Sequence, residues 1–266
     1  MKRERQIGVE VLADPHALAR AVADWMLGLA TSTKGSFAVA LSGGSTPRLL
    51  YQCLADAPFR EAFPWSRTHV FWGDERFVPH SDSRSNFGMA RDTLLSRVPI
   101  PAQNVHAIQT EGIGIEAAAA NYEHELRKFY GGNRLTAERP LFDLALLGLG
   151  EDGHIASLFP DAPALDERRR WVDVVIGAEP DMRITLTLPT LESSRHLAFL
   201  VQGEGKRAIL RRLHDEDASL PAARLHPIGE EEWFLDRSAA GLSFTTGSLG
   251  LPSRAIPATL HSTPRR

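Results

Sequence analysis

The sequence predicts an α/β fold in which a mostly parallel, Rossmann-like central sheet carries helices on both faces. Short apolar segments alternate with amphipathic segments along most of the chain, and several apolar segments end in turns rich in glycine and polar residues. Such alternation is typical of a parallel sheet covered by helices. Sheets of this kind bind ligands outside the carboxyl ends of their strands, so the turns there are the candidates for a site.

The first clear element is a helix over 15–30, where Leu18, Val22, Trp25 and Leu29 fall on one helical stripe. The elements after it alternate between strand and helix. Buried strands are predicted at 36–41, 69–72, 141–150, 184–188 and 196–201. Helices are predicted over 42–55, 85–95, 115–130 and 203–214, the third of them ended by Gly131 and Gly132.

We interpret residues 1–240 as a single α/β domain. After Ala240 the composition shifts to Ser, Thr, Pro and Gly with little periodicity. We therefore expect residues 241–266 to form a C-terminal tail that is mobile or draped over the surface.

Composition and charge narrow the class of protein. Lys and Arg number 30 against 33 for Asp and Glu, a net charge of −3 that gives no general attraction to nucleic acid or anionic membrane. Cys53 is the only cysteine, so no internal disulfide or thiolate zinc cluster can form. The basic start is not followed by the apolar segment of a secretory signal, and no stretch has the length of a membrane span. We expect a soluble, cytoplasmic protein.

The first candidate segment is ALSGGSTPRLLY, residues 40–51, which has the layout of a strand, a glycine turn and a helix start. Ser45 or Thr46 is expected to cap the helix. Exposed N–H groups at such a helix end bind anions, so the candidate phosphate-binding residues are Ser42, Gly43, Gly44, Ser45 and Thr46. The alternative is an ordinary strand-to-helix turn, which also favours Gly, Ser and Pro.

The second segment is VFWGDERFVPHSDSRSNFGMA, residues 70–90, in which Asp74, Glu75 and Arg76 follow a predicted strand and Asn86 opens a helix. An arginine directly after a strand end can clamp a phosphate or face a developing oxyanion. The alternative is a surface patch of salt bridges, which is the commoner fate of such a triplet.

The third segment is ALLGLGEDGHIASLFP, residues 145–160. His154 follows the most apolar strand, and a neutral imidazole accepts a proton at cellular pH. Asp152 lies where a carboxylate can orient the ring, and HIASLF is expected to enter a short helix. An ordinary polar turn is the alternative reading.

The fourth segment is LVQGEGKRAILRRL, residues 200–213, where Lys206 falls in the first turn of a predicted helix. A cation is unfavourable at that end of a helix, so an anion is expected to compensate it; an exposed basic pair is the alternative. Brought together at one sheet edge, the four segments would make a phosphate-handling pocket with a general base.

In this order the segments resemble the 6-phosphogluconolactonase family. The resemblance covers residues 7–240 and runs through SGGSTP, WGDERFVP, SNFGMAR, LLGLGEDGHIASLFP, RITLTLPTL, VQGEGKRAIL, LPAARLHP and WFLDRSAA. It implies the fold of glucosamine-6-phosphate deaminase and ribose-5-phosphate isomerase. It also implies hydrolysis of 6-phosphoglucono-δ-lactone, a phosphorylated sugar lactone, with no metal and no other cofactor, by a monomer or weak homo-oligomer.

The resemblance also implies roles for individual residues. His154 matches the general base, Arg76 matches the arginine that stabilises the carbonyl oxygen or contacts substrate, and Lys206 with the SGGST loop matches the phosphate site. Asp74 and Asn86 are further candidates for substrate binding. Whether Glu75, Glu151 or Asn86 touch substrate, and which partner fixes the His154 tautomer, stay open.

Two other functions are alternatives. The related isomerase/deaminase branch reads H-I-A-F-N-E-P, with a glutamate where this chain has Phe159, and D-E-Y where this chain has D-E-R. A phenyl ring cannot transfer a proton, so both differences favour the lactonase. A non-catalytic sugar-phosphate-binding protein is the second alternative, and the presence of His154, Asp152 and Arg76 argues against it.

Overall fold

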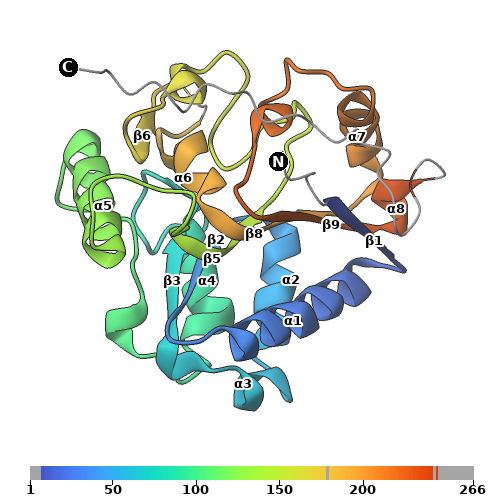
Figure 1. The fold of residues 1–266 in the computed structure, drawn as a ribbon, viewed down its shortest axis with the longest axis horizontal. Coiled ribbons are helices and arrows are strands. Elements are labelled where there is room, and N and C mark those ends of the chain that lie inside the picture. The colour runs from blue at the N-terminus through green and yellow to red at the C-terminus, as the bar shows by residue number, and fades with distance from the viewer. Residues whose placement is uncertain (1–6, 178–179, 242–243, 245–266) are drawn as a thin grey trace.

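The computed structural model describes residues 7–177, 180–241 and 244. Within these ranges the central sheet has the strand order β1-β9-β8-β5-β2-β3, and its neighbouring strands are parallel (Figure 1). The predicted parallel sheet is therefore confirmed. Its strands are β1 (Ile7–Leu12), β2 (Phe37–Leu41), β3 (Thr68–Trp72), β5 (Phe142–Leu147), β8 (Ser194–Val201) and β9 (Glu230–Asp236).

A second, antiparallel sheet of three strands lies beside the first. Its order is β4 (Asp74–Arg76), β7 (Arg183–Leu186) and β6 (Val172–Val175). The strand predicted at 184–188 belongs to this sheet and not to the central one. Arg76, predicted directly after the end of a central strand, is instead the last residue of β4. Gly73 joins the two sheets, because its N–H donates to Leu41 O and its carbonyl accepts from Leu186 N.

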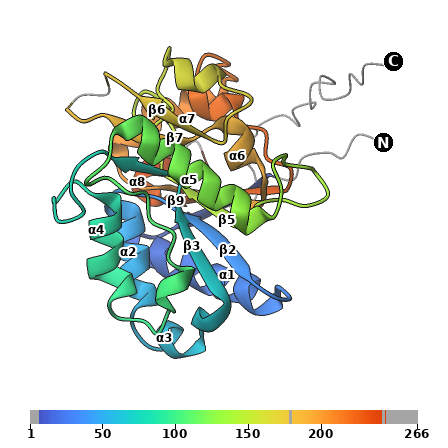
Figure 2. The same cartoon turned by 90° about the vertical axis from the view of Figure 1, so that its left-hand side faces the viewer.

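Helices cover both faces of the central sheet, as predicted. Figures 1 and 2 show α1 and α2 on one face and α5 and α6 on the other. The helices are α1 (Pro15–Ser32), α2 (Ser45–Leu54), α3 (Phe59–Ala62), α4 (Asn86–Ala90, continued by a π-helix over Arg91–Leu95), α5 (Ile115–Tyr130), α6 (Leu188–Glu192), α7 (Arg207–His214) and α8 (Arg237–Ala240).

The buried stripe of α1 differs from the predicted one. Leu18 and Val22 are buried, but Trp25 and Leu29 are only half-buried, and Met26 lies in the core instead. The stripe is rotated because the small side chains of alanines allow the helix to approach α2 and β9 closely; the buried alanines are Ala19, Ala23 and Ala30.

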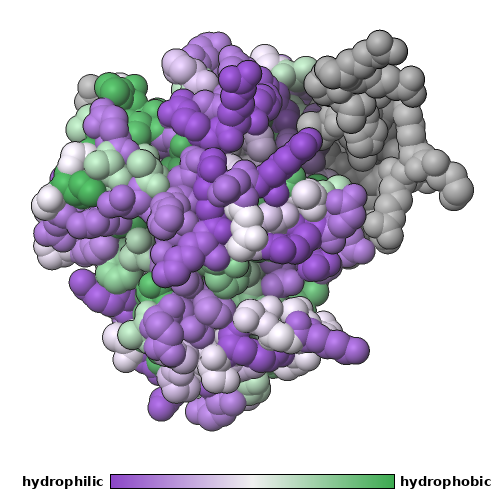
Figure 3. All heavy atoms as spheres, turned by 60° about the vertical axis from the view of Figure 1, so that its left-hand side comes forward, coloured by the Kyte–Doolittle hydropathy of each residue, from purple (hydrophilic) through white to green (hydrophobic). Residues whose placement is uncertain are grey.

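The core fills the space between the central sheet and its helices. All five residues of β2 are buried, as expected for a strand covered on both faces. On the face drawn in Figure 3, hydrophilic residues surround small, separate hydrophobic patches. Apolar side chains therefore concentrate in the core rather than on this face.

Two further predictions concern the ends of the fold. The C-terminal tail predicted at 241–266 lies outside the described residues, apart from Gly241 and Phe244, so the division at residue 240 stays a prediction. Among the described helices, none combines the length and apolar character needed to cross a membrane.

The short helix expected to begin in HIASLF does not form. Residues 155–158 make a tight turn in which Leu158 N donates to Ile155 O at 2.8 Å, and Ala156 has φ +47°. A residue in that left-handed region cannot continue a right-handed helix.

Candidate active site

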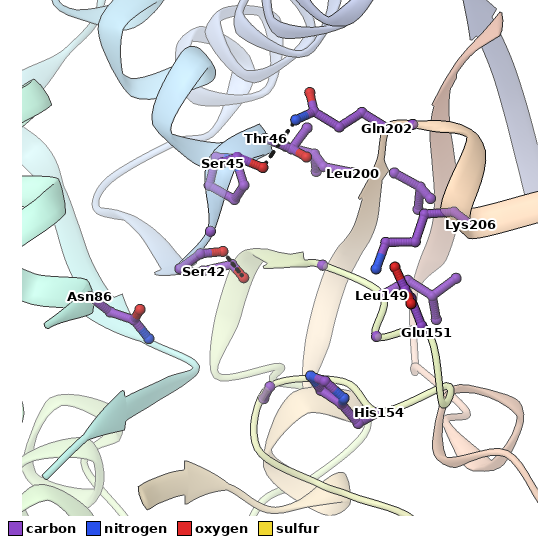
Figure 4. Close-up of a pocket in the computed structure, with 18 of the residues that line it drawn as sticks. Ser42, Ser45, Thr46, Asn86, Leu149, Glu151, His154, Leu200, Gln202 and Lys206 are labelled. Carbon is purple, nitrogen blue, oxygen red and sulfur yellow. Dashed lines mark hydrogen bonds between the residues drawn. The ribbon is translucent and has the colours of Figure 1, made fainter. Parts of the chain in front are cut away.

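A pocket of about 710 Å³ opens at the carboxyl ends of β2, β5 and β8, where parallel sheets bind ligands. Every predicted site residue except Asp152 lines it. The predicted residues in its wall are Ser42, Gly43, Gly44, Ser45, Thr46, Asp74, Arg76, Asn86, His154 and Lys206. Figure 4 shows side chains converging on the pocket from separate elements, among them those of Ser42, Asn86, His154 and Lys206.

A buried tyrosine holds the SGGST loop through two hydrogen bonds to Ser42. The hydroxyl of Tyr51 donates to Ser42 O at 2.7 Å and accepts from Ser42 N at 3.0 Å. Burial raises the pKa of Tyr51 far above its usual value, so the hydroxyl keeps its proton. Position 43 requires glycine because the side chain of Asn86 lies so near its backbone that a Cβ would be 1.9 Å from Oδ1 of Asn86. The loop is thus held rigidly beside Asn86.

Neither Ser45 nor Thr46 caps α2, contrary to the prediction. The N-cap is Gly44 at φ +107°, so the helix starts at Ser45, and no side chain of the described residues caps it. The hydroxyl of Ser45 instead accepts a hydrogen bond from Gln202 Nε2 at 3.0 Å (Figure 4). The uncapped first turn of a ten-residue helix faces the pocket, which is the arrangement that binds anions.

His154 and Asp152 form a hydrogen-bonded pair. Nδ1 of His154 lies 2.6 Å from Oδ1 of Asp152, and the backbone N–H of His154 donates to the same oxygen at 3.1 Å. Burial alone would raise the pKa of Asp152, but this backbone hydrogen bond and the attraction of the ring outweigh it and lower that pKa. Because the ionised carboxylate accepts a hydrogen bond from Nδ1–H, the neutral ring keeps its proton on Nδ1 and presents the lone pair of Nε2.

Gly150 makes room for this pair. A Cβ at Gly150 would lie 2.1 Å from Nδ1 of His154 and 2.5 Å from Oδ1 of Asp152. The turn is closed by hydrogen bonds from Gly150 N to His154 O at 2.9 Å and from Gly153 N to Gly150 O at 3.1 Å. Gly150 of GLGEDGH is therefore required by the packing of the pair.

Phe159 packs against the ring of His154. The two ring centroids are 4.5 Å apart at an angle of 42°, and the guanidinium carbon of Arg183 lies 6.0 Å from the centroid of Phe159. Phe159 therefore lies between the histidine and an arginine of the pocket wall.

Arg183 was missed by the sequence analysis. It lines the pocket and is the cross-strand partner of Arg76, on β7 opposite β4. Burial, and then the nearby charge of Arg76, lower the pKa of Arg183. Within the described residues, the buried Nε of Arg76 has no hydrogen-bond partner, and its Nη1 donates to Arg84 O. Two neighbouring guanidiniums in a pocket wall are suited to an anionic ligand. The motif RITLTLPTL contains Arg183, but only the register of β4 and β7 reveals its neighbour.

Glu75 supports the site without lining the pocket. The residue is 1% exposed, and its carboxylate accepts from the backbone N–H groups of Asn86 and Phe87, both at 2.7 Å. Burial raises the pKa of Glu75, and these hydrogen bonds at the start of α4 oppose that rise. Asn86, by contrast, lines the pocket and donates from Nδ2 to Asp74 O at 2.9 Å.

Lys206 and Glu151 line the end of the pocket opposite Asn86 (Figure 4). Lys206 ends a short 3-10 helix (Glu204–Lys206) that leads into α7. A Cβ on Gly205 would lie 3.0 Å from Oε1 of Glu151, so the carboxylate lies beside the turn that carries Lys206 (Figure 4). The ammonium group thus adds a third cation to the pocket, beyond the two arginines.

Comparisons with known proteins point to one family. A family model described as glucosamine-6-phosphate isomerases/6-phosphogluconolactonase matches residues 13–234. A Nostoc sp. protein named 6-phosphogluconolactonase is 40% identical over 237 residues, which cover 87% of this chain and 96% of that protein. The crystal structure of 6-phosphogluconolactonase from Thermotoga maritima is 32% identical with a TM-score of 0.74, covering 87% of this chain and 100% of that one. A monomeric glucosamine-6-phosphate deaminase shares the fold, with a TM-score of 0.74 at 20% identity over 88% of this chain and 99% of that one.

Proposed function

The chain belongs to the family of glucosamine-6-phosphate isomerases and 6-phosphogluconolactonases, and we propose that it hydrolyses 6-phosphoglucono-δ-lactone to 6-phosphogluconate, the second step of the oxidative pentose phosphate pathway. The observation that carries the proposal is the 2.6 Å hydrogen bond between Asp152 and His154, the latter in the wall of a pocket that is also lined by two arginines and a lysine. Opening a lactone requires a base, a group that stabilises the oxyanion and an anchor for the phosphate.

His154 acts as the base in this proposal. Nε2 takes a proton from water while the water oxygen bonds to the lactone carbonyl carbon, giving a tetrahedral oxyanion. The carbon bond to the ring oxygen then breaks, and the imidazolium returns its proton to that leaving oxygen. Asp152 keeps the ring in the reactive tautomer and stabilises its cationic form.

The cations of the pocket divide the remaining tasks. We assign Arg76 to the oxyanion, because its buried Nε has no partner in the described part of the protein. We assign Arg183, Lys206 and the uncapped first turn of α2 to the phosphate. A dianion beside Arg183 offsets the burial that lowers its pKa. Binding the phosphate far from the carbonyl then supplies energy that orients the reacting group.

No observation favours the deaminase alternative. Phe159 contacts the base at the position where the deaminase branch has a proton-transferring glutamate, and its ring has no proton to transfer. A cytoplasmic location and a monomeric or weakly oligomeric state are further parts of the proposal. The single cysteine of the sequence fits a reducing compartment.

The test is hydrolysis of freshly generated lactone, followed by proton release and corrected for spontaneous hydrolysis. Ammonia release from glucosamine 6-phosphate is measured in parallel. The expected result is lactone hydrolysis well above the spontaneous rate and no ammonia. Ammonia release without lactone hydrolysis would show that the protein is a deaminase. The absence of both activities would favour a non-catalytic sugar-phosphate-binding protein.

A further inference from the structure

A strained turn directly follows the proposed base, His154, in the chain. Residues 155–158 form the turn, and its first central residue is Ala156 at φ +47°. Turns with positive φ at that position favour glycine, because a Cβ is unfavourable there. Ala156 also lines the pocket, two residues after His154. Something in the surrounding structure must hold this turn in its unfavourable conformation.

The next residue, Ser157, supplies that hold. It is completely buried, and its hydroxyl donates to Oδ2 of Asp74 at 2.6 Å. Its backbone N–H donates to Oγ1 of Thr185 at 3.2 Å. The hydroxyl and the backbone N–H of one buried residue therefore attach the turn to the antiparallel sheet.

The two partners of Ser157 are themselves paired. Asp74 on β4 and Thr185 on β7 are cross-strand partners, and Arg76 and Arg183 form the pair two residues further along the same two strands. Ser157 thus bridges the turn that follows His154 and the strands that carry both arginines. These two parts of the pocket wall come from different sheets, so their spacing is not set by strand register.

We propose that Ser157 is a positioning residue that holds Ala156 in its left-handed conformation and so sets the distance between His154 and the arginine pair. The inference rests on the proposed function for its kinetic consequence. Ser157 does not line the pocket and contacts no reacting group. It acts through the turn, where the free-energy cost of a positive φ falls on Ala156.

The experiment compares Ser157→Ala, Ala156→Gly and the double variant. S157A is expected to lower kcat for the lactone roughly tenfold, since small displacements of catalytic groups are costly. Affinity for 6-phosphogluconate should stay within about twofold, because the proposed phosphate site is untouched. The double variant should regain most of the lost kcat, because glycine adopts φ +47° without a Cβ penalty.

Ser194→Ala is the matched control. Ser194 is equally buried, its hydroxyl makes one hydrogen bond, to Leu191 O at 2.8 Å, and it lies at the start of β8 away from the pocket. S194A is expected to lower Tm to a similar extent as S157A without lowering kcat. A kcat of S157A within twofold of that of S194A would overturn the proposal, and so would a double variant with no higher kcat than S157A.

A second readout separates this inference from the proposed function. The ring NMR signals of His154, identified by their loss in H154A, should shift in S157A and return in the double variant. If the wild type fails to hydrolyse the lactone, the proposed function fails, but this shift still reports the positioning of the ring. Unshifted His154 signals in S157A would contradict the inference whatever the substrate.

Discussion

Arg76 and Arg183 lie directly opposite each other on the antiparallel strands β4 and β7, in the wall of one pocket. Like charges at such positions destabilise the free protein. The pair is explained if its cost is offset by an anion when substrate binds. The arrangement therefore predicts that ligand binding and protein stability are coupled at this site.

Replacing Arg183 with Met is expected to weaken binding of 6-phosphogluconate about tenfold or more, because a charge-assisted contact to the phosphate is lost. The rise in Tm caused by the product should shrink accordingly, while the ligand-free variant should be as stable as the wild type or more so. Titration calorimetry and thermal unfolding measure both effects. R76M is the comparison: it should lower kcat more than product affinity. Equal effects of R76M and R183M on product affinity would contradict the separate roles.

Replacing His154 with Ala should lower kcat by roughly 10²–10⁴-fold, the usual contribution of a positioned general base. Product affinity should change little, because the proposed phosphate contacts remain. Stopped-flow proton release and equilibrium binding check the two expectations. Unchanged turnover would exclude His154 as the base.

Replacing Asp152 with Asn should lower kcat, because an amide presents both a donor and an acceptor to Nδ1 and no longer fixes the tautomer. The pKa of Asp152 is lowered in the folded protein, so its contribution to stability is present above the ordinary value of 3.8 and is lost as the pH falls below it. The Tm difference between wild type and D152N should therefore shrink between pH 5 and pH 3. A difference that grows over this range would contradict the assignment.

Replacing Gly150 with Ala should displace His154, because the added Cβ would lie 2.1 Å from Nδ1. Activity is expected to fall by about 10²-fold or more. The matched control is Gly28→Ala, where a Cβ on α1 meets no described atom within 4 Å and alanine favours the helix. G28A should raise Tm and leave kcat unchanged. Full activity in G150A would show that the pair tolerates displacement.

Replacing Phe159 with Leu should lower kcat several-fold, because the ring that packs on His154 at 4.5 Å is lost while the site stays apolar. F159Y retains the aromatic face and should keep most of the activity. The comparison of kcat for the two variants checks the role of the ring. If F159L were fully active, Phe159 would serve packing alone.

The sequence predicted those parts of the fold whose patterns are local. Helix α5 ends where Gly131 adopts φ +69°, and β5 is apolar and buried from Leu144 to Leu147 because both of its faces are covered there. Strand β9 was not predicted from periodicity, since three successive glutamates open it and obscure its buried half. Strands β1 and β6 were missed as well, because both are short and their apolar residues are interrupted by charges.

The site was predictable where a motif carries the chemistry in one segment. His154 and Asp152 are two residues apart, so their contact could be expected from the sequence. Arg183 could not be found in this way, because its neighbour Arg76 is brought beside it only by the register of a sheet that was not predicted. The short helix expected after His154 was wrong because hydrogen bonds from Ser157 to a distant part of the chain hold Ala156 in a left-handed turn.

The order of the central sheet has a consequence for biosynthesis. β1, the earliest described strand, is hydrogen-bonded to β9, the last, which lies between β1 and β8. While the chain emerges from the ribosome, β1 therefore has no partner in this sheet until β9 has followed it out. Asp236 and Ser238, which line the pocket, emerge with or after β9. In a chain stalled before residue 230, the edges of β1 and β8 that β9 covers in the folded protein would be unpaired. We expect such nascent chains to be recognised by chaperones or to aggregate.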